Sequence, residues 1–229
     1  GGKQIGNGIG NQGIGRNVIR NGDFRINQRQ GSTYSDGVMN LDGWYSGTGS
    51  AGTRTIQQMS TNQFPGYYYR RTMTSTPTLV ASSFEWIASQ QFEGNFLTHL
   101  NLGASNDTGR VTLSFWVRSS ITGTSSVLLG VKNTSGTWYY SFKQFSISTA
   151  NTWEYKTITF IVGTSNTCPT PPIDNTFAAG IWFVGCIGSN YQGVSQDVFS
   201  TTVLAGTSSN TNFCVNGATF DIARVQLEA

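Results

Sequence analysis

The stretch Arg110-Val-Thr-Leu-Ser-Phe-Trp-Val-Arg-Ser119 alternates apolar and polar side chains along its whole length. The apolar set consists of Val111, Leu113, Phe115 and Val117. A period of two residues is that of a β-strand with one buried face. Turn-forming residues stand before and after the stretch, at 106–109 and 122–123. We therefore predict a central strand of a β-sandwich here, with Leu113 and Phe115 buried.

Composition extends this prediction to the rest of the chain. Of the 229 residues, 11% are charged and 13% are aromatic, and 28 are glycine. Such a chain favours short strands, tight turns and a neutral polar surface. Further β-prone runs occupy residues 67–73, 125–132, 137–147, 153–162 and 176–187. The three runs between 125 and 162 suggest consecutive antiparallel strands, and residues 83–91 have room for one helical turn at most.

Charge and apolar patterning argue against two classes of partner. The net charge is +3, and five of the fourteen basic residues lie within the first 29 positions, so no dense basic stripe for nucleic acid is present. No window of about 18 apolar residues and no leader pattern occurs. We predict neither nucleic-acid binding nor membrane insertion.

The three cysteines, Cys168, Cys186 and Cys214, are few, odd in number and far apart in sequence. This spacing does not predict a zinc site or a secreted disulfide framework. Reduced, buried thiols in a protein that is made in a cytoplasm are the simpler interpretation.

Residues 1–16 contain seven glycines and a loose repeat of Ile5, Ile9 and Ile14. A flexible linker would have this composition, because so many glycines leave backbone entropy uncompensated. The end of a fibre shaft, with isoleucines of several subunits around one axis, would have it too. The sequence leaves both interpretations open.

Residues with catalytic chemistry are few in this sequence. His99 is the only histidine, and the chain has no nucleophile elbow, zinc-protease motif or phosphate-binding loop. His99 has the chemistry of a general base, but a lone histidine is more often a surface residue. The eleven carboxylates are scattered. We predict no catalytic residue, no cofactor and no enzyme activity.

Several short motifs resemble those of one family. Asn21-Gly-Asp-Phe24 followed by Ile26-Asn-Gln-Arg29 resembles the opening signature of a domain in tail-fibre and other virion structural proteins of tailed bacteriophages. Asp42-Gly-Trp44 resembles its next motif, with Gly in place of Arg. Further likenesses follow in the family's order at 90–94, 113–119, 151–156 and 217–228. The resemblance covers roughly residues 17–229.

That family in turn resembles jelly-roll carbohydrate-binding modules, many of which hold a structural calcium between the first and last strands. Ala223 and Arg224 stand where two aspartates would be expected, although Asp23 and Asp221 remain nearby in the pattern. Calcium wants six to eight oxygen ligands, so we predict no metal site.

Together these observations predict an all-β, jelly-roll β-sandwich of two antiparallel sheets with a Gly-rich N-terminal segment. Residues 1–16 form the linker or fibre-shaft end, and residues 17–229 form a sandwich like that of carbohydrate-binding modules.

Exposed aromatic faces beside hydrogen-bonding groups are what sugar binding needs. Trp116 and Arg118 belong to the polar set of the strand at 110–119, and Trp138 and Tyr140 belong to an aromatic run after a turn. We predict that these four residues bind glycan, on strands that we expect to be neighbours. Packing in the core or between subunits is the competing interpretation for each ring.

The resemblance implies a non-enzymatic structural or adhesion module of a tailed-phage virion, in a tail fibre or capsid decoration, that is made in the host cytoplasm. Its expected partners are other virion proteins, copies of itself in a homotrimer, and a host or environmental glycan. One alternative is a virion assembly protein without glycan binding. A less favoured alternative is a polysaccharide depolymerase.

Overall fold

The computed structural model describes residues 17–28, 39–48, 52–105, 109–194 and 197–229. The predicted linker or shaft segment 1–16 lies outside the described residues. Within them, helix is limited to short 3₁₀ turns at Gly94–Phe96, Thr98–Leu100, Thr164–Asn166 and Ser189–Tyr191. None of these described helices is long and apolar enough to cross a membrane.

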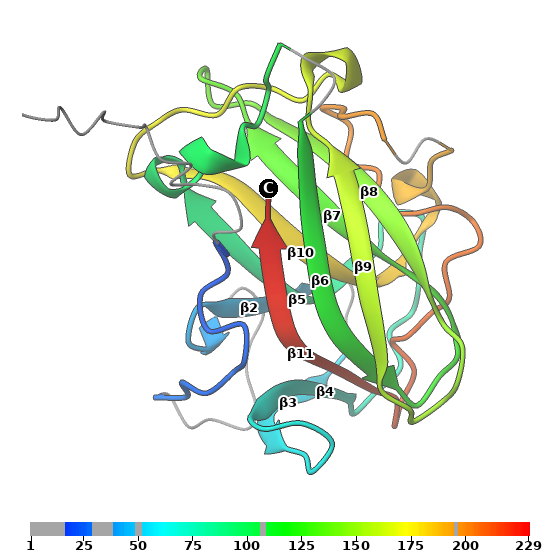
Figure 1. Cartoon of the computed structure of the whole chain (residues 1–229). Helices are drawn as coiled ribbons and strands as arrows, with labels where there is room; N and C mark the ends of the chain where they lie inside the picture. The colour runs from blue at the N-terminus through cyan, green and yellow to red at the C-terminus, as the bar shows by residue number, and fades with distance from the viewer. Residues whose placement is uncertain (1–16, 29–38, 49–51, 106–108, 195–196) are drawn as a thin grey trace, which may run out of the picture.

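Two antiparallel sheets pack face to face, as Figure 1 shows for β11, β6 and β9 in front of β10 and β7. The six-stranded sheet has the order β1 (Met39–Leu41), β2 (Trp44–Thr48), β5 (Phe84–Glu93), β10 (Phe177–Ile187), β7 (Gly123–Lys132) and β8 (Trp138–Ile147). The five-stranded sheet has the order β3 (Arg54–Ser60), β4 (Tyr67–Met73), β11 (Thr219–Glu228), β6 (Arg110–Ser119) and β9 (Glu154–Ile161). The fold is the predicted jelly-roll β-sandwich.

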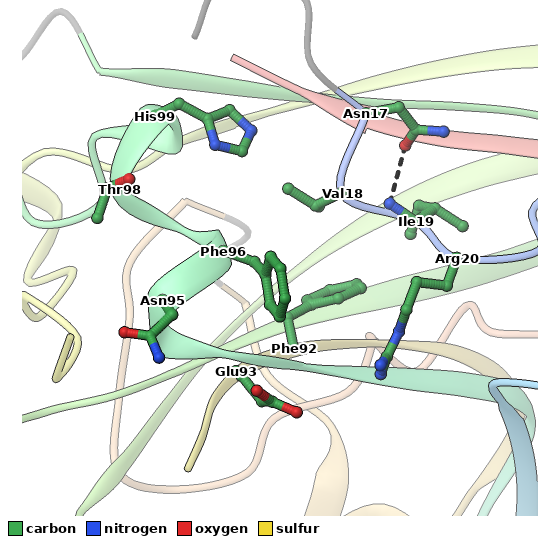
Figure 2. A pocket seen from close by; sticks show the side chains of 10 residues that line it. All are labelled: Asn17, Val18, Ile19, Arg20, Phe92, Glu93, Asn95, Phe96, Thr98 and His99. Carbon is green, nitrogen blue, oxygen red and sulfur yellow. Dashed lines mark hydrogen bonds between the residues drawn. The ribbon is translucent and has the colours of Figure 1, made fainter. Parts of the chain in front are cut away.

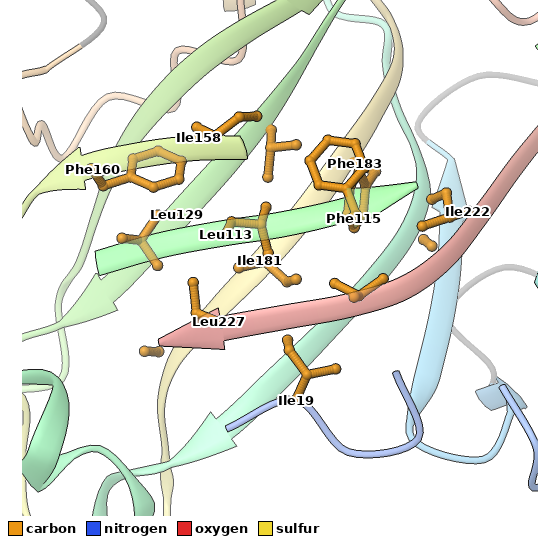
Figure 3. Packing of buried hydrophobic residues seen from close by; sticks show 14 of the residues in the cluster. Ile19, Leu113, Phe115, Leu129, Ile158, Phe160, Ile181, Phe183, Ile222 and Leu227 are labelled. Atoms are coloured by element: carbon orange, nitrogen blue, oxygen red, sulfur yellow. The ribbon is translucent and has the colours of Figure 1, made fainter. Parts of the chain in front are cut away.

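The alternating strand at 110–119 is β6, between β11 and β9. Leu113 and Phe115 are fully buried, which confirms the predicted register, because a slip of one residue would turn the other face inward. Phe115 makes edge-to-face contacts with Phe145 of β8 and Phe183 of β10, at ring-centroid distances of 5.2 and 5.0 Å. Figure 3 shows Phe115 beside Phe183, within one core formed by inward side chains of both sheets.

Strand β5 occupies the region where at most one helical turn was expected. Its alternation is hidden because it buries polar residues, Glu85 and Gln90, whose partners lie far away in the sequence. Glu85 pairs with Arg71 at 2.7 Å, and the Gln90 amide exchanges two hydrogen bonds with the backbone of Arg20. In the sequence alone, such polar residues have the character of surface positions.

The expected succession of neighbouring strands between 125 and 162 was wrong for its last member. Strands β7 and β8 pair, but β9 crosses to the other sheet and pairs with β6. Either placement would bury Ile158 and Phe160 of β9, so the apolar pattern alone could not choose the sheet.

Candidate functional site

The four predicted glycan-binding residues lie on opposite outer faces of the sandwich. Trp116 and Arg118 are on β6 in the five-stranded sheet, and Trp138 and Tyr140 are on β8 in the six-stranded sheet. The expectation that they lie on neighbouring strands was therefore wrong. The chain changes sheet between β6 and β7, which places the core between the two pairs.

Arg118 is held by contacts within the protein. Its Nε donates to Asp221 at 2.8 Å and its Nη2 donates to the Tyr68 hydroxyl at 3.0 Å. Arg70 donates a hydrogen bond of 2.8 Å to each of the two oxygens of the same buried carboxylate. The Arg118 guanidinium also lies over the ring of Trp153, 4.8 Å from the centroid. These contacts give Arg118 a structural task, and its glycan role stays a prediction.

Trp138 and Tyr140 belong to a ring cluster that includes a third residue, Trp182 of β10. The Trp138 and Tyr140 rings are stacked, with centroids 6.0 Å apart and planes 18° apart. Trp182 meets both rings edge to face, at 5.9 and 6.0 Å. All three side chains are half-buried, so each keeps surface in contact with solvent. We call Trp138, Tyr140 and Trp182 the ring cluster.

Two glycines make room for the ring cluster on the sheet. Gly130 of β7 is in register with Tyr140 on one side and with Gly180 of β10 on the other. A Cβ atom at Gly130 would lie 2.8 Å from the Trp182 ring and 3.1 Å from the Tyr140 ring. A Cβ atom at Gly180 would also lie 2.8 Å from Trp182. Missing side chains on adjacent strands thus let a large ring lie close to the sheet.

Polar groups border the ring cluster. The Lys132 ammonium lies 5.2 Å from the centroid of the Trp138 ring, within cation–π range. Gln91 is half-buried on β5, in register with Gly180. The Tyr140 hydroxyl is a hydrogen-bond donor and acceptor, and burial raises its pKa above the ordinary value. The face thus combines stacking surfaces with hydrogen-bonding groups.

Trp182 was not predicted as a site residue, because the run at 176–187 is apolar on both faces and is typical of an interior strand. The prediction of a strand was right, since β10 is paired on both sides. The available signal was Gly180 two residues before Trp182, because both positions point to the same face of a strand.

A second aromatic group lies on β5 and the segment after β10. The Phe84 ring is 5.5 Å from Trp86 and stacks on Tyr191 at 5.0 Å. The Trp86 ring lies so close to Gly47 that a Cβ atom there would be 2.0 Å away. Tryptophan over glycine therefore occurs at two places in the six-stranded sheet.

His99 lines a separate hollow of about 250 Å³ with Glu93 and Arg20. Figure 2 shows Phe92 and Phe96 in the middle of this hollow, with Arg20 and His99 at its rim. Its volume is below the ~300–1,000 Å³ of typical small-molecule sites. We assign it no chemistry.

All three cysteines are buried free thiols, as predicted. The structure also brings Cys186 and Cys214 together with Glu85, with their ligand atoms within 4.8 Å of one another, which sequence spacing did not indicate. Arg71 donates to Glu85 at 2.7 Å and to the Cys214 sulfur at 3.6 Å. A hydrogen bond with Cys214, together with burial, raises the pKa of the Cys186 thiol. A guanidinium within the group opposes a metal cation there.

No protein-family model matches the chain, and no curated protein matches it significantly in sequence. Among solved structures, the chain is similar to the enzymatically active domain of bacteriophage CBA120 tailspike protein 4, with 12% identity and a TM-score of 0.45 over 93% of this chain. The chain spans only 21% of that tailspike chain.

It is also similar to a putative sugar binding protein from Bacteroides thetaiotaomicron, with 13% identity and a TM-score of 0.47 over 93% of this chain and 99% of that one. A third similar structure is a family 11 carbohydrate-binding module from Clostridium thermocellum in complex with a mixed-linked tetrasaccharide. It has 12% identity and a TM-score of 0.46 over 86% of this chain and 95% of that one. These TM-scores are below 0.5, so the likenesses assign neither family nor function to the chain.

Proposed function

We propose that this protein is a non-enzymatic adhesion module of a tailed-phage virion, in a tail fibre or capsid decoration, and that it binds a host or environmental glycan. The observation that carries the glycan proposal is the half-buried ring cluster on β8 and β10. The virion setting is supported by the motifs that resemble phage structural proteins.

The chemistry of the face suits a sugar. The C–H faces of a pyranose pack against indole and phenol rings, while its hydroxyls need donors and acceptors beside those rings. Gln91, Lys132 and the Tyr140 hydroxyl supply such groups. The rings stand on paired strands and contact one another, so little side-chain freedom is lost on binding.

A shallow site of this kind binds weakly. Many copies on one particle would then raise the overall avidity by ~10²–10⁴ without any new contact. Adhesion of a virion through several such modules fits the homotrimer that we expect.

A glycan array with the purified chain tests the proposal. We expect wild-type protein to bind a defined set of glycans. Trp138→Ala and Trp182→Ala should bind the same glycans at least tenfold more weakly. Phe96→Ala is the matched control, because Phe96 is a ring that is 54% exposed and lies outside the ring cluster. A thermal scan of each variant shows whether it is still folded, so that weaker glycan binding can be assigned to the lost ring contact and not to unfolding.

Two other outcomes would replace the proposal. Binding to virion proteins with no glycan on the array would favour the assembly protein. Release of reducing ends from a bound polysaccharide would favour the depolymerase.

A further inference from the structure

A polar groove lies on the opposite side of the sandwich from the ring cluster. Its volume is about 550 Å³, and it is lined by the N-terminal segment, β6, β9 and β11. Gly22 fixes one wall, because its carbonyl accepts a hydrogen bond from Val225 N at 2.9 Å. A Cβ atom at Gly22 would lie 2.2 Å from Val225 O, so only glycine permits this approach.

A β-bulge in β11 places Arg224 at this groove. The register with β6 shifts between Ala223 and Gln226, where two residues of β11 lie opposite one residue of β6. Arg224 has a φ of 50°, a left-handed conformation that is uncommon for a residue with a long side chain. Bulges re-aim side chains in this way and are enriched beside functional sites.

The guanidinium of Arg224 is held in place by protein contacts that occupy few of its N–H donors. Its Nη2 donates to the Pro65 carbonyl at 3.0 Å, and its carbon lies 5.1 Å from the centroid of the Phe64 ring. A guanidinium has five N–H donors. Within the described residues, Arg224 makes only that hydrogen bond to protein, so most of its donors are left for a ligand.

Two aromatic rings form the next part of the wall. Trp116 and Tyr155 are directly opposite each other on β6 and β9, with ring centroids 5.6 Å apart. Tyr155 is 55% exposed, so one face of its ring is open to a ligand. The groove thus offers a stacking surface on the same sheet as a cation.

The charge of the groove favours an anion. Its charged lining residues are Asp23, Arg25 and Arg224. Asp23 and Arg25 form an ion pair at 2.6 Å, so the positive charge of Arg224 is left unbalanced among the lining residues. Guanidinium binds carboxylates with two parallel hydrogen bonds, which gives both charge and geometric selectivity.

We propose that this groove binds a saccharide that carries a carboxylate, such as a hexuronate unit, with Arg224 on the carboxylate and Tyr155 against the ring of the sugar. The proposal adds a second, charge-selective site to the protein. It stands on different residues from the ring cluster, so either site can fail without the other.

Titration calorimetry with trigalacturonate tests this site, with its fully methyl-esterified form as the neutral matched ligand. We expect wild type to bind the acid at least tenfold more tightly than the ester at low salt, and the difference to shrink as salt is raised. Arg224→Gln should remove the preference for the acid, and Tyr155→Ala should weaken the binding of both ligands. Lys132→Gln and Trp138→Ala should leave the preference intact, since both positions lie on the other sheet.

Arg224→Asn serves as a second variant, because Asn tolerates the left-handed conformation and preserves the bulge. Should both substitutions unfold the protein, the indole N–H signal of Trp116 in wild type decides: half of its full shift should be reached at a trigalacturonate concentration at least tenfold lower than the ester concentration needed. Equal affinity for the two ligands would overturn the proposal. A preference that survives loss of Arg224 but is lost in Lys132→Gln or Trp138→Ala would also overturn it.

Discussion

At the scale of single residues, the fold depends on a few buried charges with assigned partners. The Asp221 side chain is 1% exposed and lies between the guanidinium groups of Arg70 and Arg118. These two residues come from β4 and β6, on either side of β11. The carboxylate therefore ties three neighbouring strands together on the outer face of the five-stranded sheet.

Asp221→Asn should destabilise the protein by about 3–5 kcal/mol, because it leaves two guanidinium groups facing each other without their counter-charge. Urea unfolding followed by tryptophan fluorescence measures the change. Asp174→Asn is the control, since Asp174 is a surface residue. Equal stability of the two variants would contradict the structural task that we give to Asp221.

Phe115→Ala should cost about 3–5 kcal/mol through lost transfer energy and the cavity left between the sheets. The same denaturation experiment measures it, with Ser114→Ala on the half-buried outer face as control. A cost below about 1 kcal/mol would mean that the core does not close around this ring.

Glu154 gives the protein one source of pH dependence. Burial raises the pKa of its carboxyl, but hydrogen bonds from Lys156, Thr149 and Ser148 lower it more, so the pKa in the folded state is below its ordinary value. A carboxyl with a lowered folded pKa stabilises the protein above its unfolded pKa. This stability is lost as the pH falls through the folded pKa.

Glu154→Gln should therefore reduce stability by about 1 kcal/mol at pH 7 and have a smaller effect toward pH 3. Thermal scans across this range measure the difference between variant and wild type. A difference that does not change with pH would show that the charge of Glu154 contributes nothing.

At the scale of elements, sequence predicted strands well where at least one face is apolar. The strand at 110–119 and the interior strand at 176–187 were found because Leu113, Phe115 and their counterparts in β10 are apolar and close in sequence. Strand β5 was missed because Glu85 and Gln90 are buried beside partners that only the fold brings near.

The candidate site was predicted in part for a similar reason. Trp138 and Tyr140 follow a turn and could be recognised as a pair from sequence. Trp182 reaches them only because β10 pairs with β7 in a register that sets Gly180 beside Gly130, a residue 50 positions earlier in the sequence. Trp116 could be placed on the outer face, but its neighbours Tyr155 and Arg224 come from two other strands.

Gly180→Ala tests the contribution of the glycine pair. The added Cβ would lie 2.8 Å from the Trp182 ring and 3.0 Å from the Gln90 carbonyl oxygen, so the ring must move. We expect glycan binding to fall at least tenfold with a stability loss of about 1–3 kcal/mol. Gly109→Ala is the control, because its Cβ would meet only Val162 closely, at 3.3 Å. Unchanged glycan binding by Gly180→Ala would show that recognition does not depend on the position of the Trp182 ring.

At the scale of the whole molecule, the sandwich carries aromatic groups on both outer faces with one core between them. Such an arrangement allows one face to hold a glycan while the other holds a second ligand. Useful adhesion through weak sites also needs several copies, which makes the oligomeric state part of the account.

We expect the intact chain to form a homotrimer, and a chain that lacks residues 1–16 to be monomeric. Sedimentation equilibrium of both proteins measures this. An intact chain that sediments as a monomer would count against the trimer, and avidity would then have to come from other parts of the particle.

Glycan recognition by the ring cluster can be tested directly with the six tryptophans of the chain as reporters. The measurement is a nitrogen-15 NMR titration of the indole N–H signals with the best neutral glycan from the array. Our account predicts saturable shifts of Trp138 and Trp182, while Trp44, which is fully buried in the core, stays unchanged. Saturable binding that leaves Trp138 and Trp182 unshifted would contradict the account.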